Sequence, residues 1–450
     1  MEGKKLNNKF TIMNFMDRES VKQYLIEANR RKLPDMIERD LDIEISGKVK
    51  VIYGVRRAGK SYRMFQEMNR MIKGKETMDN ILHLNLEHPL LSDLSHRDLY
   101  ETLSIQWQLF PSSRKSLYIF LDEPQNIESW EKAVRGFHDD GLDVTITGSS
   151  SRLLSKEIAT SLRGRSASFM ILPFSFSEFI RARKTELDTK RIGFKDRAVL
   201  LGELDAYLRI GGFPELVMES DERKRLHSLM EYLDLIVFRD IVERFDVRNT
   251  AMVKWLARAA MASASGELSV HRLHNSLRSE GMSVSKNSLY DYLSMLEESM
   301  FLFVIRRFSP SPRKKKVSEG KVYLSDVGFL ELTARDDARG RRMENQVFLQ
   351  ILRELPPGDE ISYWKDPAGH EVDFVISSGG KPRLLIQSCY TLKDSETSRR
   401  ELIELEKASQ ELKCKKAIIV TYDEGGREDL DGLTVEKVPL WEFLLNQSIQ

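Results

Sequence analysis

Cysteine is scarce in this sequence of 450 residues, which contains only Cys389 and Cys414. The two are not spaced as metal ligands, and so few thiols favour a reducing compartment over a disulfide-bonded, secreted protein. Long apolar runs are lacking too, since no stretch approaches the roughly 20 residues of a membrane-spanning helix. Residues 1–20 also lack the apolar core of a signal sequence. We therefore expect a cytoplasmic protein that does not bind membranes.

An excess of charge of either sign is also absent. The 70 basic and 69 acidic side chains give a formal net charge of +1. A nucleic-acid-binding surface would then be a local basic patch, and not a field over the whole molecule. Hydrophobic residues make up 41% of the chain, which is typical of a globular protein. The length is enough for about three domains.

The stretch from Val49 to Phe65 carries the strongest chemical signal. A β-branched apolar run leads into a match to G-x-x-x-x-G-K-[ST], and a helical pattern follows it. Backbone N–H groups of such a loop and the positive end of its helix face nucleotide phosphates. Lys60 would reach the β- and γ-phosphates, and the Ser61 hydroxyl would ligate Mg²⁺. The predicted nucleotide-binding residues are Gly54, Val55, Arg56, Arg57, Ala58, Gly59, Lys60, Ser61 and Tyr62.

Three further strands are predicted to end at the same site, because α/β proteins place site residues at the carboxyl ends of strands. One apolar strand ends in Asp122, which would hold Mg²⁺, and Glu123, which would polarise the attacking water. Thr147 and Ser149 end another strand, where they would sense the γ-phosphate, cap a turn, or do both. Glu87 ends an earlier strand. It would either position the water or remain a solvated acid, and the sequence favours neither.

Arg163 and Arg165 flank a glycine before the last predicted strand of this region. Such arginines can act as fingers on the transferred phosphate, from the same chain or from a neighbour in a homo-oligomer. A pair of surface salt bridges is the ordinary alternative. The alternation of strands and helices predicts a parallel sheet. The extra strand before the Asp122 strand fits the hydrolases in which an acid such as Glu123 activates water.

The middle of the chain has a different character. Residues 183–248 are predicted to be mostly helical, with a break at residues 211–214, and to form either a lid beside the nucleotide or a plain helical linker. Residues 250–335 contain three helical patterns followed by two strands, the order of a winged helix. The third helix would present Lys286 and Asn287 at the end that reads a major groove.

A basic run separates the two strands of this predicted winged helix. It has no acidic residue and would form a wing tip that contacts nucleic-acid phosphates, through Arg313, Lys314, Lys315 and Lys316. The alternatives are a solvated loop and a module that contacts a protein. We expect nucleic acid to be the partner, with a protein partner as the alternative.

Taken together, these motifs resemble the archaeal and bacterial AAA-class ATPases that carry a C-terminal nuclease-like domain. The later stretches Gly211–Glu215 and Glu371–Val375 fit the same family. The resemblance covers most of the chain. It implies a P-loop fold, ATP as the nucleotide, and ATP hydrolysis, but it implies much less about the biological role.

The last 110 residues are similar to the restriction-endonuclease-like fold. In that fold a helix Glu, a strand Asp and a following acid-x-Lys motif bind metal and activate water. The resemblance carries the two metal-binding roles over to Glu344 and Asp373.

The third motif of that fold is altered in this chain. Gln387 stands where the acid belongs, and Cys389 stands where the lysine belongs. Lys365 or Lys393 could replace the lysine, although nothing in the sequence shows it. We therefore expect a degenerate nuclease fold in preference to an active one.

The sequence thus predicts an α/β protein with an AAA-like P-loop core on a parallel sheet, a helical lid, a winged helix and a nuclease-like domain. The predicted boundaries are 1–46 for a helical lead-in, then 47–182, 183–248, 249–335 and 336–450. The predicted function is an Mg²⁺-dependent ATPase that acts on DNA. A nucleotide-controlled switch with a protein partner and an ATP-gated, metal-dependent nuclease are the alternatives.

Overall fold

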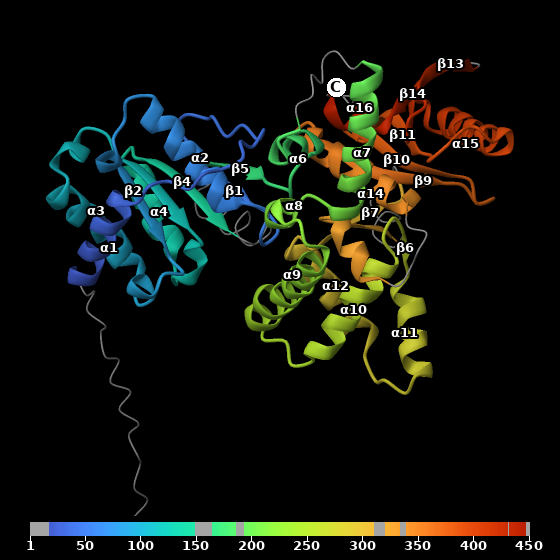
Figure 1. Ribbon diagram of the computed structural model, residues 1–450. Helices are drawn as coiled ribbons and strands as arrows, with labels where there is room; N and C mark the ends of the chain where they lie inside the picture. Colours follow the sequence, from blue (N-terminus) through green and yellow to red (C-terminus); the bar gives the residue numbers. More distant parts are fainter. Residues whose placement is uncertain are drawn as a thin grey trace, which may run out of the picture.

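A computed structural model of the chain describes residues 18–148, 164–185, 193–309, 320–333, 339–430 and 432–446. They form two lobes that lie side by side in Figure 1. The smaller lobe holds strands β1 to β5 (blue to teal), and the larger lobe runs from α6 to α16 (green to red). Within these ranges no helix combines the length and the apolar composition that crossing a bilayer requires.

The smaller lobe is built on a parallel sheet with the strand order β2-β3-β4-β1-β5. Apolar side chains cover both of its faces, so that α1, α3 and α4 pack on one face and α2 on the other. This arrangement confirms the predicted α/β fold with a parallel-sheet core. The elements are β1 (Val49–Tyr53), α2 (Lys60–Lys73), β2 (Ile81–Asn85), α3 (His96–Leu109), β3 (Tyr118–Asp122), α4 (Trp130–Asp139), β4 (Asp143–Gly148) and β5 (Ser166–Met170).

The N-terminal segment differs from the predicted helical lead-in. Its described helix, α1, covers only Arg18–Arg30, and residues 31–45 contain no helix or strand. Pro34 disfavours a helical conformation in this stretch. The apolar face of α1 packs on the same core as β1 to β4, and the Tyr24 hydroxyl accepts a hydrogen bond from the Asn85 N–H at 2.8 Å. Helix α1 is therefore an integral part of the smaller lobe.

The first half of the larger lobe is mostly helical. Its helices are α6 (Phe176–Ala182), α7 (Phe194–Ile210), α8 (Pro214–Met218), α9 (Glu222–Leu235), the π-helix η5 (Ile236–Glu243), α10 (Thr250–Ala262), α11 (Val270–Ser279) and α12 (Lys286–Glu298). They lead into an antiparallel sheet with the order β6-β8-β7, made of β6 (Gly266–Leu268), β7 (Leu302–Arg306) and β8 (Gly320–Leu324). Strands β7 and β8 were expected from the sequence. The short strand β6 was not.

The second half of the larger lobe is a mixed sheet with the order β13-β14-β12-β11-β10-β9. Its elements are α14 (Arg339–Glu354), β9 (Asp359–Lys365), β10 (Glu371–Ser378), β11 (Lys381–Ser388), α15 (Ser395–Leu412), β12 (Lys416–Thr421), β13 (Gly426–Leu430), β14 (Leu433–Pro439) and α16 (Leu440–Leu445). The Phe308 N–H donates to the Tyr363 carbonyl at 2.7 Å, so the chain after β7 continues onto the edge strand β9.

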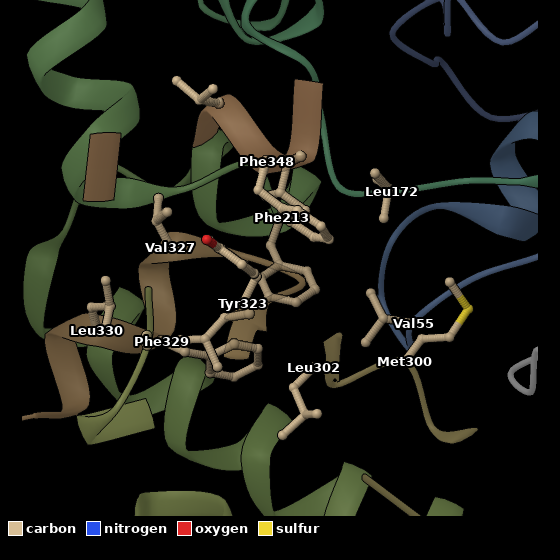
Figure 2. Packing of buried hydrophobic residues seen from close by; sticks show 14 of the residues in the cluster. Val55, Leu172, Phe213, Met300, Leu302, Tyr323, Val327, Phe329, Leu330 and Phe348 are labelled. Carbon is tan, nitrogen blue, oxygen red and sulfur yellow. The ribbon is translucent and has the colours of Figure 1, made fainter. Parts of the chain in front are cut away.

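The largest hydrophobic core cluster spans most elements of the larger lobe, and Figure 2 shows part of it. Phe213 packs edge-on against Phe329, and Tyr323 stacks on Phe348 of α14 with ring centroids 4.4 Å apart. The same cluster takes in Val55 of the phosphate loop. Packing is therefore continuous across the predicted boundaries at residues 248 and 335, and it extends to the loop where the two lobes meet.

Candidate functional site

The phosphate loop lies between β1 and α2, and its shape depends on its two glycines. Gly59 has a φ of 96°, a left-handed conformation that other residues disfavour. Gly54 has no room for a side chain, because a Cβ there would lie 2.1 Å from the carbonyl oxygen of Ile171. Helix α2 begins at Lys60, so its first N–H groups face the loop. The predicted residues 54–62 thus form one turn at the end of a central strand.

Ser61 and Asp122, the predicted Mg²⁺ ligands of this loop, lie beside each other. The Ser61 hydroxyl donates a hydrogen bond of 2.7 Å to Asp122 Oδ2. The Thr147 hydroxyl, at the end of β4, donates to the other oxygen of the same carboxylate. Hydroxyl and carboxylate oxygens are suitable ligands for Mg²⁺, so this pair fits the ion. Ser149, the other predicted sensor, lies outside the described residues.

Lys60 and Glu123 are adjacent at the same edge of the sheet. Lys60 Nζ donates to the carbonyl oxygens of Gly54 and Val55 at 3.2 and 3.3 Å. It lies 3.9 Å from Glu123 Oε1. Glu123 has a φ of 54°, an uncommon conformation for a residue with a side chain, and such residues gather at functional sites. The structure thus brings together the predicted phosphate-binding cation and the predicted water-activating acid.

Glu87 follows β2 and lies among the charges around the loop. Partial burial, and then the charge of Glu123, raise the pKa of its carboxyl, while Arg56 and Lys60 lower it. The protonation of this carboxyl is therefore coupled to the charges of Glu123, Arg56 and Lys60. Both predicted alternatives for Glu87, a residue that positions the water and a solvated acid, are compatible with this position.

Arg165 does not lie near the phosphate loop. Its carbonyl accepts from the N–H of Val49, the first residue of β1, and its guanidinium pairs with Asp139 on the surface. The phosphate loop begins after the other end of β1, and the five residues of this strand separate its two ends by roughly 16 Å. The prediction of Arg165 as a finger within the same chain is therefore wrong, because a residue that precedes a parallel strand lies at the opposite edge. Arg163 lies outside the described residues.

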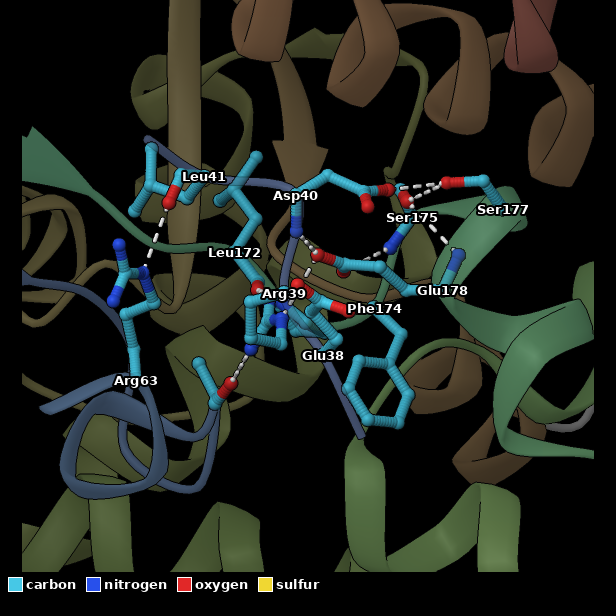
Figure 3. Close-up of polar contacts among 12 residues, drawn as sticks. Glu38, Arg39, Asp40, Leu41, Arg63, Leu172, Phe174, Ser175, Ser177 and Glu178 are labelled. Carbon is cyan, nitrogen blue, oxygen red and sulfur yellow. Dashed lines mark hydrogen bonds and ion pairs between the residues drawn. The ribbon is translucent and has the colours of Figure 1, made fainter. Parts of the chain in front are cut away.

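Arg39 contacts the backbone of the phosphate loop and holds it in place, a role that the sequence did not reveal (Figure 3). It is 6% exposed, and its guanidinium donates to the carbonyl oxygens of Ala58 and Leu172 at 2.7 and 2.6 Å. It also pairs with Glu178 at 3.0 Å and lies over the ring of Phe174. A segment without regular structure thus fixes the loop against α6.

Two arginines of the loop reach the larger lobe. Arg56 pairs with Asp240 of η5 through an Nη2–Oδ1 distance of 3.0 Å, across 184 sequence positions. Arg57 lies 3.7 Å from Glu215 and over the ring of Tyr232. Sequence reasoning placed both arginines in the phosphate loop but found neither partner, because no local pattern links residues this far apart.

Glu344 and Asp373, the predicted metal ligands of the C-terminal region, do lie together, but around the ammonium of a lysine. Lys321 Nζ is 3.2 Å from Glu344, 2.8 Å from Asp373 and 2.6 Å from Glu371. These carboxylates raise the pKa of Lys321 although burial lowers it, and burial raises the pKa of Glu344 to about 8. Across the described ranges, no three His, Cys, Asp or Glu side chains are arranged to hold a metal. The predicted metal pair therefore does not fit an ion here.

The residues of the altered third motif take structural roles. The Gln387 side-chain oxygen accepts from the Asp373 N–H at 3.1 Å, and its amide donates to Glu401 at 2.7 Å. Burial raises the pKa of the Cys389 thiol to about 11, so it stays protonated at neutral pH. Lys365 bridges Glu267 and Glu371 at 3.1 and 3.0 Å. The lysine beside the two acids is Lys321 of β8, which precedes Asp373 by 52 positions and which sequence reasoning missed.

A cavity of about 430 Å³ opens beside Lys321, between the three-stranded sheet and the C-terminal sheet. Both signs of charge line it. The charged residues are Glu267, Arg272, Lys321, Arg341, Lys365 and Glu371.

Lys286 and Asn287 begin α12, as predicted, and Ser285 caps the helix by accepting from the Ser288 N–H at 3.0 Å. Tyr290, one turn further along, is 56% exposed. This helix end therefore presents polar and aromatic side chains to solvent. The basic residues 313–316 lie outside the described residues.

Three protein families match successive parts of the chain. Residues 46–180 match the family described as "AAA domain". Residues 201–339 and 339–443 match two families described as domains of unknown function, DUF8612 and DUF4143. The AAA match covers the whole sheet of the smaller lobe together with the phosphate loop, which supports the assignment of this lobe as an ATPase domain.

Two relatives resemble the chain over most of their length. "Uncharacterized protein MJ1544" of Methanocaldococcus jannaschii is 35% identical over 422 residues, which cover 92% of each chain. A protein of Haemophilus influenzae is 27% identical over 396 residues, or 87% of this chain and 94% of the relative. Among solved structures, a DNA polymerase III gamma subunit-related protein of Thermotoga maritima is 12% identical, covers 63% of this chain and 99% of its own, and has a TM-score of 0.25.

Proposed function

This chain belongs to the same family as the Methanocaldococcus jannaschii protein and carries an AAA-type ATPase domain, and from this premise we propose that it is an Mg²⁺-dependent ATPase that acts on DNA. In this proposal, ATP binding and hydrolysis in the smaller lobe change the state of the larger lobe. The larger lobe holds the DNA.

One observation carries the proposal. At the N-terminus of α2, the Ser61–Asp122 pair lies beside the Lys60–Glu123 pair, so an oxygen pair suited to Mg²⁺ adjoins a cation and an acid. Four groups with these roles, brought together from two separate stretches of the sequence, are what hydrolysis of a nucleoside triphosphate needs. The AAA match and the position at the carboxyl ends of the strands support the same function.

Each residue of the site has a defined task in this proposal. Ser61 and Asp122 hold Mg²⁺, which neutralises charge on the phosphates. Lys60 binds the β- and γ-phosphates, and Glu123 accepts the proton of the attacking water. Thr147 keeps the Asp122 carboxylate in place through its hydrogen bond.

DNA is the proposed substrate because of the region from α10 to β8. Three helices followed by a strand hairpin have the order of a winged helix, and α12 presents Lys286, Asn287 and Tyr290 at its N-terminal end. Such an end can enter a major groove. The basic residues 313–316 stand between β7 and β8 in the sequence, and in this proposal they contact phosphates.

The decisive experiment is ATP turnover by the purified full chain, with and without double- and single-stranded DNA, beside Glu123→Gln. Stimulation by DNA that disappears in the variant is the expected result. The absence of turnover under every condition would exclude an ATPase. Replacing residues 313–316 with glutamine should weaken DNA binding and reduce its salt dependence, while an unchanged salt slope would remove the wing from the proposal.

A nucleotide-controlled switch that binds a protein is the second candidate. It is favoured by the packing of the phosphate loop itself, since Val55 and Ala58 belong to the hydrophobic core of the larger lobe. A change in the conformation of the phosphate loop would therefore alter the packing of the larger lobe directly. Turnover that is indifferent to every nucleic acid, with tight nucleotide binding retained, would favour this candidate.

We do not propose nuclease activity for the C-terminal region, because the Lys321 ammonium already contacts both Glu344 and Asp373 where a metal ion would have to bind. Plasmid incubated with the protein and Mg²⁺ or Mn²⁺ should stay intact. Cleavage that Asp373→Ala abolishes would show the opposite, and equal cleavage by both proteins would indicate a contaminant.

A further inference from the structure

Arg56 extends from the phosphate loop to a buried carboxylate of the larger lobe. Its Nε lies 3.3 and 3.2 Å from the two oxygens of Asp240, and its Nη2 lies 3.0 Å from Oδ1. The forked guanidinium has a geometry that suits carboxylates and phosphates equally. Asp240 is 4% exposed, so its charge depends on this partner.

Arg56 lies in the phosphate loop, four positions before Lys60, and its ion pair with Asp240 lies in the electrostatic field of the groups proposed to act on the γ-phosphate. Glu123 and Glu87 both act electrostatically on Arg56, and Lys60 and Glu123 act on Asp240. A γ-phosphate held by Lys60 would therefore bring a second anion within reach of the same arginine. Two anions would then compete for one guanidinium.

Asp240 belongs to a π-helix, η5, which continues α9 without a break. π-helices are rare and frequently occur at functional sites. The η5 helix packs against both α9 and α10. The Arg56–Asp240 pair thus connects the phosphate loop to an irregular helix inside the larger lobe.

We propose, resting on the ATP-binding function above, that Arg56 senses the γ-phosphate by exchanging Asp240 for it when ATP binds. Asp240 is the positioning residue that holds Arg56 when no γ-phosphate is present. The exchange makes and breaks only ion pairs and hydrogen bonds. It releases η5 from the phosphate loop, so that the larger lobe responds to the difference between ATP and ADP.

The experiment is calorimetric binding of ATPγS and of ADP, each with Mg²⁺, to the full chain. The measured quantity is the ratio of the ADP dissociation constant to the ATPγS dissociation constant. We expect Arg56→Gln to lower this ratio about tenfold, because it removes a charge-assisted contact to the γ-phosphate. We expect Asp240→Asn to raise it about threefold to tenfold, because it weakens the competitor for Arg56. In the double variant the ratio should equal that of Arg56→Gln alone.

Asp234→Asn is the matched control. Asp234 lies on α9, six positions before Asp240, and pairs with Lys254 of α10. Its substitution should leave the ratio unchanged. Arg56→Lys keeps the charge but loses the fork, so its ratio should fall between those of the wild type and Arg56→Gln. Thermal unfolding midpoints confirm folding of each variant, and Arg56→Lys, which keeps a cation beside the buried Asp240, carries the test if Arg56→Gln or Asp240→Asn does not fold.

An unchanged ratio in Arg56→Gln would overturn the proposal. So would an Asp240→Asn effect of equal size with and without Arg56, since Asp240 would then act by repelling the nucleotide. A wild-type chain that binds neither nucleotide would overturn the ATP-binding function instead. The two failures are therefore distinguishable.

Discussion

Lys60 and Lys321 are both buried lysines beside acidic side chains, but their partners differ. Lys60 donates to two backbone carbonyl oxygens and lies 3.9 Å from one carboxylate, so most of its charge remains for an incoming phosphate. Lys321 lies within 3.2 Å of Glu344, Glu371 and Asp373, which neutralise it fully. The same residue types thus form a binding site in one lobe and a structural ion cluster in the other.

The largest expected effect concerns the smaller lobe, where we propose that Lys60 and its neighbours hydrolyse ATP. Glu123→Gln preserves the side-chain shape but removes the base, so ATP turnover should fall by roughly 10²- to 10⁴-fold while nucleotide binding remains. Phosphate release and binding of a fluorescent ATP analogue measure the two quantities. Lys60→Ala should lose binding as well as turnover, and full activity of that variant would place the site elsewhere.

In the larger lobe we expect Lys321 to stabilise the fold and to take no part in catalysis. Lys321→Met should lower the free energy of unfolding by about 3–5 kcal/mol, because it leaves the buried acidic side chains of this cluster without their central cation. Urea unfolding followed by tryptophan fluorescence measures this loss. Lys365→Met is the matched control, since Lys365 also pairs with Glu371 but is 31% exposed, and it should cost about 1 kcal/mol or less. Equal costs for the two variants would remove the special role of Lys321.

Asp326 lies beyond the end of β8 that is opposite Lys321, and it connects this end to the turn between α7 and α8 within the larger lobe. It accepts from the N–H groups of Gly212 and Gly328 at 2.6 and 2.7 Å, and burial raises the pKa of its carboxyl from 3.8 to about 7. Because this pKa is higher in the folded state, the protonated form stabilises the fold. That contribution is complete below pH 3.8 and is lost as the pH rises through about 7.

Asp326→Asn should therefore remove this part of the pH dependence of stability. The difference in unfolding free energy between wild type and variant, measured from about pH 4 to 8, should change with the sign just described. Parallel profiles for the two proteins would mean that Asp326 titrates normally.

The smallest expected effect concerns metal binding, which we expect in the smaller lobe and not at Asp373 of the larger lobe. Mn²⁺ should bind with nucleotide at the Ser61–Asp122 pair, and Ser61→Ala should weaken it about tenfold, the loss of one ligand worth about 1.4 kcal/mol. Asp373→Asn should change nothing, because Lys321 already occupies its carboxylate. Electron paramagnetic resonance measures bound Mn²⁺. A nucleotide-independent Mn²⁺ site that Asp373→Asn abolishes would break the comparison.

Much of the smaller lobe was predictable because its signals are local. The strands before the phosphate loop and before Asp122 and Thr147 are short apolar runs, and each lies where the periodicity placed it. Parallel pairing then brings their carboxyl ends to one edge, which is why Ser61, Asp122 and Thr147 meet. Arg165 was misplaced for the same geometric reason, since it precedes a strand and therefore lies at the opposite edge.

The amino-acid sequence by itself determined the phosphate loop, because a strand, a glycine-containing loop and a helix N-terminus follow one another within 20 residues. Only the tertiary structure decided what surrounds that loop and what became of the C-terminal acids. Arg56 meets Asp240 across 184 positions, and Lys321 meets Asp373 across 52. Burial of opposite charges forces such pairs to form, but the pairing depends on how the lobes pack and leaves no periodic trace along the chain.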